Sequence, residues 1–303
     1  MMLSRGDDCL GIPRSIMKLT FIALVAFSLT GLSWGCSEDG KSGFLPKNDM
    51  YIPVGTKSIS GGLSQTQFNT VITKIKDLYA LEIASLGGSL VMNRIWADGE
   101  VNASAEREGK KWIVNMTGGL ARHSSVTADG LALVVCHELG HHIGGAPKKK
   151  LSINGWSSAE GQSDYFAALK CLRRLFLNDN NAAIVKTLKA PALLVAACTK
   201  AHSKEDALIC IRTSMAGMSV AALFQSLSGE KAAQFNTPDK KAVAATYEKH
   251  PGTQCRLDTF FQGALCEKGM NETVSQSDEV RGTCHRTTNH KLGVRPACWF
   301  KTK

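Results

Sequence analysis

Two short polar motifs near the middle of the chain constrain its fold more than any other feature. His137-Glu-Leu-Gly-His141 has the form HExxH, and Glu160-Gly-Gln-Ser-Asp164 has the form ExxxD. On a helix, residues i and i+4 project from one face, so both imidazoles of the first motif can reach one metal ion. Glu138 lies one position further round that helix, where its carboxylate can take a proton from a water on the metal. The spacing therefore predicts two helices that meet at a metal site.

The second motif supplies the remaining groups that a zinc site needs. A catalytic zinc ion takes three protein ligands and keeps a fourth position open, and Glu160 is the predicted third ligand beside His137 and His141. Asp164 lies one turn further along the same helix face, where it can accept the N–H of a liganding histidine. The stretch Ser157-Ser-Ala-Glu160 also fits a capping box, in which Glu160 serves only the start of its helix. The sequence leaves both roles open.

Together, HELGH and EGQSD resemble the motifs of the gluzincin zinc metallopeptidases. This family includes the CaaX prenyl-protein endopeptidases, the membrane protease HtpX and periplasmic metalloproteases of outer-membrane assembly. The resemblance implies a zinc-dependent endopeptidase with Glu138 as general base and Asp164 behind a histidine. The interval between the two motifs is shorter than is usual for the family. The four hydrophobic spans of its integral-membrane members are absent from the sequence, so the resemblance points to a soluble secreted branch.

Two flanking segments extend the resemblance. Val101-Asn-Ala-Ser104 and the run 111–120 are similar to the family's Asn-Ala hairpin, whose edge strand holds substrate. His250-Pro251 followed by Arg256 is similar to a His-Pro…Arg element that approaches the metal in some members. The resemblance implies catalytic roles for His250 and Arg256. It also implies four substrate-binding residues, which are Asn102, Ala103, Ile113 and Asn115.

The short interval between the motifs is nearer to the thermolysin pattern, which gives a second interpretation with the same chemistry. A site of that type would use a further downstream histidine to bind the oxyanion, and His202 is a candidate. His142, at the end of the HExxH helix, is predicted to be structural or exposed. The run Lys148-Lys-Lys150 is predicted to be a solvated loop.

The amino terminus has the pattern of an export signal. Lys18 precedes an apolar stretch from Leu19 to Leu32, which is too short for a stable membrane span. Leu32-Ser-Trp-Gly-Cys36 resembles a degenerate bacterial lipobox with Cys36 as the lipid acceptor. This favours a lipoprotein of the bacterial cell envelope, anchored to the membrane and facing the periplasm or the surface. Ordinary cleavage and secretion is the alternative.

The cysteine count is consistent with export. Of the 10 cysteines, Cys9 precedes the predicted start at Met17 and Cys36 is the predicted lipid acceptor. The other cysteines are even in number, which is consistent with disulfides in an oxidising compartment. Their connectivity does not follow from sequence, but proximity favours four pairs, namely Cys198–Cys210, Cys255–Cys266, Cys284–Cys298 and Cys136–Cys171.

Periodicity predicts a mostly helical α+β fold. Helices are expected at 65–86, 127–143 and 158–176, and three short strands within 90–117. We therefore expect a small antiparallel β-hairpin sheet packed beside the HExxH helix and the ExxxD helix, followed by disulfide-bonded helices. The expected organisation is a signal peptide (1–36), a zinc metallopeptidase core (37–180), a helical subdomain (181–268) and a disulfide-tied tail (269–303).

Charge adds little to the choice of partner. The formal net charge is +10, but basic residues do not cluster with aromatic ones, so no nucleic-acid partner is expected. The predicted function is zinc-dependent hydrolysis of peptide bonds in extended or unfolded envelope proteins, bound along the strand 111–117. The alternative is a non-catalytic, zinc-stabilised envelope lipoprotein that acts as a binding or chaperone module.

Overall fold

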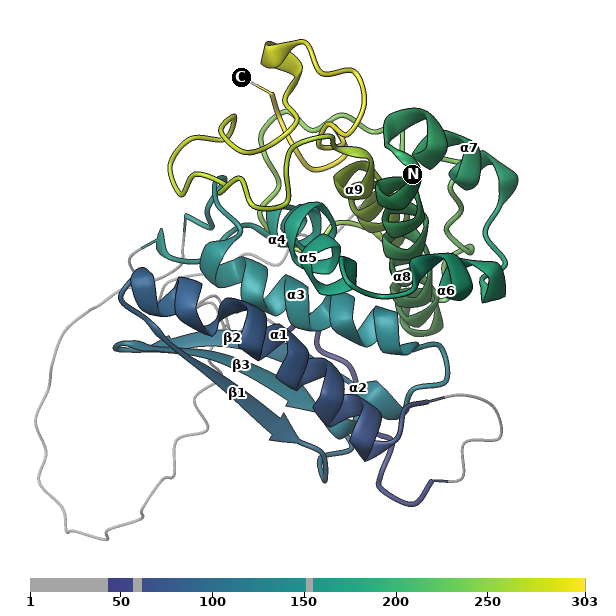
Figure 1. Ribbon diagram of the computed structural model, residues 1–303. Coiled ribbons are helices and arrows are strands. Elements are labelled where there is room, and N and C mark those ends of the chain that lie inside the picture. The colour runs from purple at the N-terminus through teal and green to yellow at the C-terminus, as the bar shows by residue number, and fades with distance from the viewer. Residues whose placement is uncertain (1–42, 57–61, 151–154, 303) are drawn as a thin grey trace, which may run out of the picture. The chain divides into compact units, whose positions relative to one another are not determined.

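A three-stranded sheet covered by two long helices forms the base of the molecule (Figure 1). The computed structural model describes residues 43–56, 62–150 and 155–302. The strands are β1 (Ser89–Ile95), β2 (Ala103–Glu108) and β3 (Lys111–Thr117). The helices that pack on this sheet are α1 (Gln65–Ser85) and α3 (Ala128–Ile143), and a short α2 (Gly118–Arg122) follows β3. Residues 1–42 include the predicted signal peptide and Cys36, and they lie outside the described residues.

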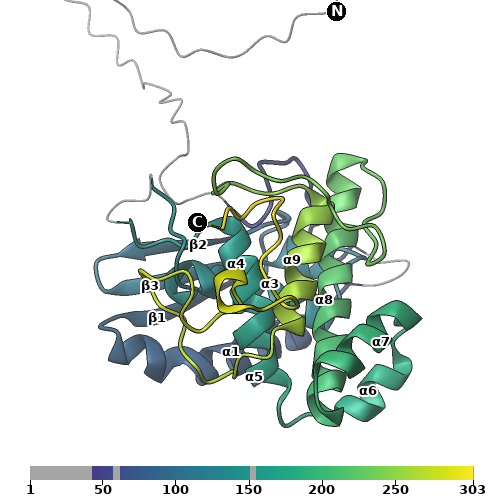
Figure 2. The same cartoon turned by 90° about the horizontal axis from the view of Figure 1, so that it is seen from above.

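The remaining helices pack above α3, and α8 and α9 run side by side next to it (Figure 2). One continuous helical segment is made of α4 (Glu160–Phe166), a π-helical turn η2 (Ala167–Cys171) and α5 (Leu172–Phe176). The others are α6 (Asn181–Thr187), α7 (Ala192–Ala201), α8 (Lys204–Ser228) and α9 (Thr253–Leu265), with a 3₁₀ turn η3 (Arg286–Thr288) near the carboxyl terminus. By length and composition α8 could cross a membrane, but 78% of its most apolar window is buried inside the molecule.

The two base helices begin where their sequences place capping residues. Ser64 accepts a hydrogen bond from the Gln67 amide, and the Gln67 side chain returns to the Ser64 amide, which completes a capping box for α1. Thr127 caps α3 through the Gly130 amide. Five residues of α1 at helical spacing are fully buried and form the face that packs on α3 and β1, namely Phe68, Ile72, Ile75, Tyr79 and Ile83.

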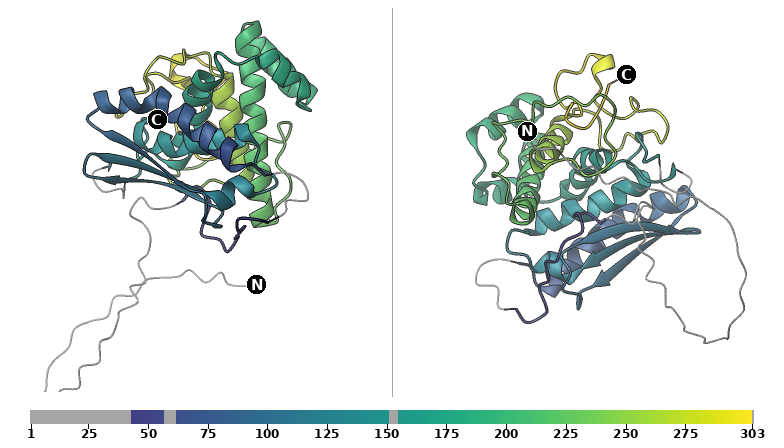
Figure 3. Two further views of the ribbon diagram at one scale, coloured as in Figure 1. Left: turned by 60° about the horizontal axis from the view of Figure 1, so that its bottom comes forward. Right: turned by 180° about the vertical axis from the view of Figure 1, so that it is seen from behind.

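The sheet has the order β1-β3-β2 and is mixed. Strands β2 and β3 form the predicted antiparallel hairpin, whereas β1 pairs with β3 in parallel. The α+β class is confirmed, and the sheet gains a parallel edge strand that alternation along the sequence does not reveal. Its outer face turns away from the helices (Figure 3) and carries polar side chains, with the Asn115 amide bonded to Asn93, Ser104 and Glu106.

Four disulfides tie the helices together. Cys136–Cys171 joins α3 to the π-helical turn, and Cys198–Cys210 joins α7 to α8, both as predicted. The other two predicted pairs are wrong, because the structure contains Cys255–Cys298 and Cys266–Cys284. The chain after α9 folds back along that helix. The start of α9 is therefore joined to the carboxyl-terminal tail, and the end of α9 is joined to the segment before η3. Four disulfides indicate an oxidising, extracytoplasmic location.

The described residues from 43 onward belong to one compact unit. The main apolar core lies between the sheet, α1, α3 and α8, and a second cluster lies among α7, α8 and α9. The sequence Thr237-Pro238-Asp239 fits a helix start, with proline at the first helical position, yet no helix forms there. Residues 230–252 instead run as irregular chain, pinned by the bond from the Asp239 amide to Asp258 and by backbone bonds to residues 297–299. This irregular segment carries His250 toward the start of α4.

Candidate metal centre

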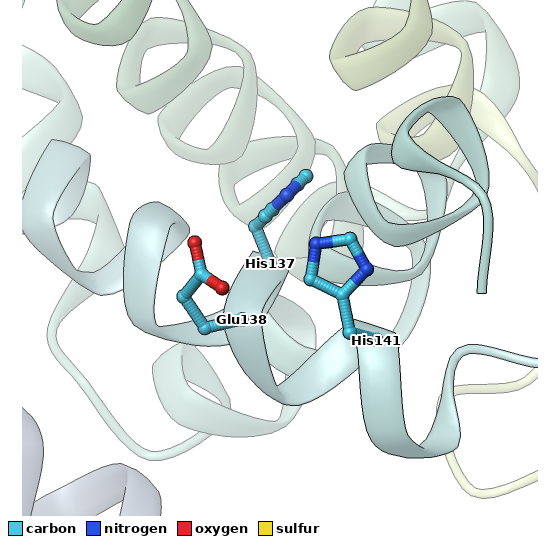
Figure 4. Close-up of side chains that lie close together, drawn as sticks. All are labelled: His137, Glu138 and His141. Atoms are coloured by element: carbon cyan, nitrogen blue, oxygen red, sulfur yellow. The ribbon is translucent and has the colours of Figure 1, made fainter. Parts of the chain in front are cut away.

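The HExxH motif lies in the buried carboxyl-terminal half of α3. His137, Glu138 and His141 project from neighbouring positions of this helix toward one side (Figure 4), and their ligand atoms lie within 4.8 Å of one another. His137 and Glu138 are fully buried, and His141 is 3% exposed. Gly140 lies between the histidines, and a Cβ there would come within 3.0 Å of the Ser163 backbone on α4. This close approach brings the two motif helices together, and the group could hold a metal ion.

The carboxylate of Glu160 lies beside both imidazoles. Its Oε2 is 3.1 Å from His137 Nε2, and its Oε1 is 3.6 Å from His141 Nε2. The capping-box alternative is not seen, since α4 begins after Ala159 without a side-chain cap. The Glu160 amide instead donates to the Glu248 carbonyl on the irregular segment. We call His137, His141 and Glu160 the donor cluster.

The tautomers of the two histidines favour a cation inside the donor cluster. His137 Nδ1 lies 2.7 Å from the Asp164 carboxylate, and His141 Nδ1 lies 3.0 Å from the Ser158 carbonyl. Both partners accept hydrogen bonds, so each Nδ1 carries the proton and each Nε2 of a neutral ring presents a lone pair. Two lone pairs and a carboxylate therefore converge in a buried space. Such an arrangement is unfavourable unless a positive charge balances it.

The pKa values of the donor-cluster residues reflect the same crowding of charged and polar groups. Burial opposes charge on His137, but Asp164 and Glu160 outweigh it and raise the pKa of His137 to about 9. Burial similarly opposes charge on Glu160, but Lys149, His250 and His141 outweigh it and hold the pKa of Glu160 well below its usual range. Burial keeps the pKa of His141 well below its usual range. A divalent metal could take the place of the His137 proton as a balancing positive charge.

Asp164 connects the donor cluster to a fully buried arginine. Arg256 on α9 donates from Nε to Asp164 Oδ2 at 2.8 Å and from Nη2 to Asp164 Oδ1 at 2.7 Å. It also donates from Nη1 to the Phe44 carbonyl at 3.0 Å and is 1% exposed. Arg256 is therefore placed to fix the carboxylate that orients His137, not to touch a substrate. These contacts favour a positioning role, and the predicted catalytic role stays a prediction.

His250 lies against the donor cluster from the irregular segment. Its Nε2 is 3.4 Å from Glu160 Oε2 and 2.9 Å from the carbonyl of Gly43. Burial lowers the pKa of His250 below its usual value. The side chain is 18% exposed, so it lies at the border between the cluster and solvent. This location suits a group that approaches the metal.

A lysine that the sequence analysis assigned to a solvated loop lies inside the site. Lys149 Nζ is 2.6 Å from Glu160 Oε1, and the side chain is 14% exposed. Its neighbour Lys148 is also largely buried and donates to the Trp156 carbonyl and to Gln276, and burial lowers the pKa of Lys148 to about 7. Only Lys150 is exposed as predicted, at 84%. In the sequence, only the position of the lysine run between the two motifs indicates that one of its members could lie at the site.

The predicted substrate residues separate into two groups. Asn102 and Ala103 lie at the start of edge strand β2, beside the site, where Asn102 Oδ1 accepts from the Leu45 amide and the Ala103 carbonyl accepts from the Phe44 amide. Ile113 and Asn115 belong to β3, which is the central strand. Because β3 is paired on both sides, the prediction that residues 111–117 form the edge strand is wrong. The edge strand of the hairpin is β2.

Glu138 lies in an environment that favours its neutral form. Burial raises the pKa of Glu138 to about 8, an effect that His137 partly offsets. Among the residues that the structure describes, neither Glu138 carboxylate oxygen has a hydrogen-bond partner. A buried carboxyl group with free acceptor atoms beside a cation site is suited to proton exchange with a bound molecule.

The two other predicted histidines are structural. His142 is buried, bonds to the Ile113 carbonyl and stacks between Trp112 and Trp156, and burial lowers its pKa to about 3. It is therefore neutral, although its place at the end of α3 would favour a cation. His202 bonds to the Ala264 carbonyl near the end of α9, roughly 12 Å along that helix from Arg256. This placement does not support the thermolysin-like use of His202.

No protein-family model, curated protein or solved structure matches this chain. What the site can do must therefore follow from its own geometry.

Proposed function

We propose that this protein is a zinc-dependent endopeptidase of the envelope, with the donor cluster as its metal site. The observation that carries the proposal is the approach of one carboxylate, Glu160, to within 3.1 and 3.6 Å of two imidazole nitrogens, with Glu138 alongside. Two histidines and one glutamate form the ligand set of a catalytic zinc, which keeps a fourth position open. Membership of the gluzincin family belongs to this proposal and rests on the motif resemblance alone.

Each residue around the donor cluster has a separate role in the proposed reaction. Zinc, when bound, acts as a Lewis acid and makes water a stronger acid. Glu138 accepts a proton from the water that attacks the peptide carbonyl and then passes this proton to the leaving amine. Asp164 holds His137 in the tautomer that presents Nε2, and the Ser158 carbonyl does the same for His141. Neither Glu138 oxygen is hydrogen-bonded within the part of the chain that the structure describes, so both are available for this proton.

The substrate would bind as an extended chain on the edge of β2. The Ala103 carbonyl points outward, since it accepts from the Phe44 amide. Backbone groups alternate along a strand, so we expect Ala105 and Arg107 to point the same way and to offer hydrogen bonds to an added strand. Main-chain hydrogen bonds depend little on which side chains the substrate carries, but they require an extended backbone. This favours unfolded or extended protein substrates.

The cellular setting of the proposal is the bacterial envelope. The four disulfides support an oxidising compartment. The lipobox-like sequence ending at Cys36 supports attachment to a membrane through a lipid. No nucleic-acid partner is proposed.

A non-catalytic zinc-stabilised lipoprotein, acting as a binding or chaperone module, is the second candidate. The observation that favours it is the position of His250 Nε2, 3.4 Å from Glu160 Oε2. A histidine there can act as a fourth ligand and close the site, and a closed site is typical of a structural zinc.

One experiment separates the two functions. Zinc content and casein proteolysis are measured for the mature protein, for Glu138→Gln and for His250→Ala. An endopeptidase binds one zinc per chain and cleaves casein, and Glu138→Gln keeps the zinc but loses the activity. If only His250→Ala is active, the native enzyme is latent. Stoichiometric zinc without cleavage by any variant refutes the endopeptidase and supports the structural role.

A further inference from the structure

The lysine at the donor cluster is held there by its own backbone. The Lys149 amide donates to the Ser157 carbonyl at 2.8 Å, and the adjacent Lys148 and Ser158 form an antiparallel bridge. On the other side, the Lys150 amide donates to Glu248 Oε2 at 2.8 Å. The three consecutive residues are thus fixed on both flanks, and only the middle one sends its side chain to Glu160. This anchoring presents a single ammonium group to the cluster.

The Lys149 ammonium is in direct contact with the donor cluster. Its Nζ contacts the same Glu160 oxygen that lies 3.6 Å from His141 Nε2. The ammonium therefore lies against the carboxylate that the proposed function assigns to the metal.

The other cationic or donor groups nearby are committed elsewhere. Arg256 is bound twice to Asp164 and once to the Phe44 carbonyl, and at 1% exposure it cannot reach a substrate. His250 Nε2 lies 2.9 Å from the Gly43 carbonyl. Lys149 combines a long flexible side chain with 14% exposure, so its ammonium can turn from Glu160 toward a bound carbonyl oxygen.

We propose that Lys149 is a catalytic residue that stabilises the negative charge formed on the carbonyl oxygen of the scissile peptide bond. This inference rests on the proposed endopeptidase function. When water adds to the carbonyl carbon, the π-electron pair of the C=O bond moves to oxygen, and the Lys149 ammonium donates a hydrogen bond to that oxygen. Glu138 takes the proton of the water. The C–N bond then breaks, the amine receives the proton from Glu138, and Lys149 keeps its own proton throughout.

The variant Lys149→Met tests this role, with Lys150→Met as the matched control. Loss of one oxyanion donor lowers kcat by roughly 100- to 1,000-fold. We expect that loss for Lys149→Met, with KM for casein-derived peptides changed less than about threefold. Lys149→Arg should recover part of kcat. Lys150→Met removes the same charge from an exposed position and should leave kcat unchanged.

Two binding measurements separate this role from a structural one. A phosphonamidate peptide carries a tetrahedral oxyanion, whereas a peptide amide of the same sequence does not, so Lys149→Met should weaken only the first by at least about tenfold. The affinity for zinc, measured against a chelator, should stay equal or become tighter, because the metal no longer displaces an ammonium from Glu160.

The results decide between the possible roles. If Lys149→Met keeps kcat and phosphonamidate affinity, the oxyanion role is refuted while the endopeptidase stands on its Glu138→Gln control. If Lys149→Met loses zinc, Lys149 supports the metal site instead, and the role is likewise refuted. If no form cleaves casein, the endopeptidase fails, and the catalytic role of Lys149, which rests on it, fails with it.

Discussion

The link between Asp164 and Arg256 offers the sharpest test of the site's geometry. Asp164 Oδ1 lies 2.7 Å from both His137 Nδ1 and Arg256 Nη2, and its Oδ2 accepts from Arg256 Nε at 2.8 Å. In Asp164→Asn, the size is kept but one acceptor oxygen becomes an NH₂ donor. The amide keeps one acceptor oxygen and no charge. In one orientation its NH₂ group faces His137 Nδ1 and Arg256 Nη2, and in the other it faces Arg256 Nε, so in either case both residues lose their carboxylate partner.

Two separate magnitudes follow from this loss. Removing the hydrogen-bond partner of a metal-binding histidine costs roughly 10- to 100-fold in metal affinity, or about 1.4–2.7 kcal/mol. Leaving the Arg256 charge buried without its carboxylate costs about 3–5 kcal/mol in the free energy of unfolding. We therefore expect Asp164→Asn to weaken zinc binding and, separately, to destabilise the metal-free protein.

The double variant Asp164→Asn/Arg256→Met distinguishes the two effects. It removes the buried charge together with its partner, so most of the lost stability should return, while zinc affinity stays about tenfold below the wild type. Zinc affinity is measured by competition with a chromophoric chelator, and stability by urea unfolding of metal-free protein. Wild-type zinc affinity in Asp164→Asn would refute the argument, because His137 would then not depend on Asp164 for its orientation.

Three further predictions concern the fold. Removing the disulfide in Cys136→Ala/Cys171→Ala opens a loop with a sequence separation of 35 residues and should cost about 4 kcal/mol in urea unfolding; a loss below about 1 kcal/mol would contradict the chain-entropy estimate. Burial lowers the pKa of Lys170 to about 8, whereas its pKa in an unfolded chain is roughly 10.5. Between pH 8 and 10.5 only the unfolded state keeps the proton, so the free energy of unfolding should rise by roughly 1–3 kcal/mol across this range. Lys170→Met should flatten that part of the urea-unfolding profile, and an unchanged slope would contradict the assignment. Phe44 is fully buried with its ring 4.8 Å from that of His137, so Phe44→Ala should lower the free energy of unfolding by about 3–5 kcal/mol, and a loss under 1 kcal/mol in urea unfolding would show that residue 44 is not packed there.

Local patterns in the sequence predict local structure well in this chain. The apolar spacing from Phe68 to Ile83 and the capping Ser64 define α1, and Thr127 marks the start of α3. The HExxH and ExxxD spacings place the site residues on the faces of helices that meet. Each of these signals depends on residues a few positions apart, where helix geometry determines which side chains are neighbours.

Contacts between distant segments were harder to predict. The parallel pairing of β1 with β3 depends on how the chain crosses the sheet, and alternation along a strand carries no information about its neighbour. Cys255 pairs with Cys298 because the tail returns to the start of α9, which proximity in sequence does not reveal. The burial of Lys149 likewise depends on the hydrogen bond from its amide to the Ser157 carbonyl. A run of lysines gives no sign of which member is held inside.

The docking of the first described residues beside the metal centre sets the reach of this protein. The Gly43 carbonyl contacts His250, and six residues lie between Cys36 and Gly43, which makes seven Cα-to-Cα steps. A chain of that length extends at most about 25 Å. If Cys36 carries a lipid, as its sequence context predicts, this short length of chain would keep the donor cluster close to the bilayer surface. Polypeptides emerging from or lying along that surface would be accessible to it, and those deep in the surrounding compartment would have to come to the membrane.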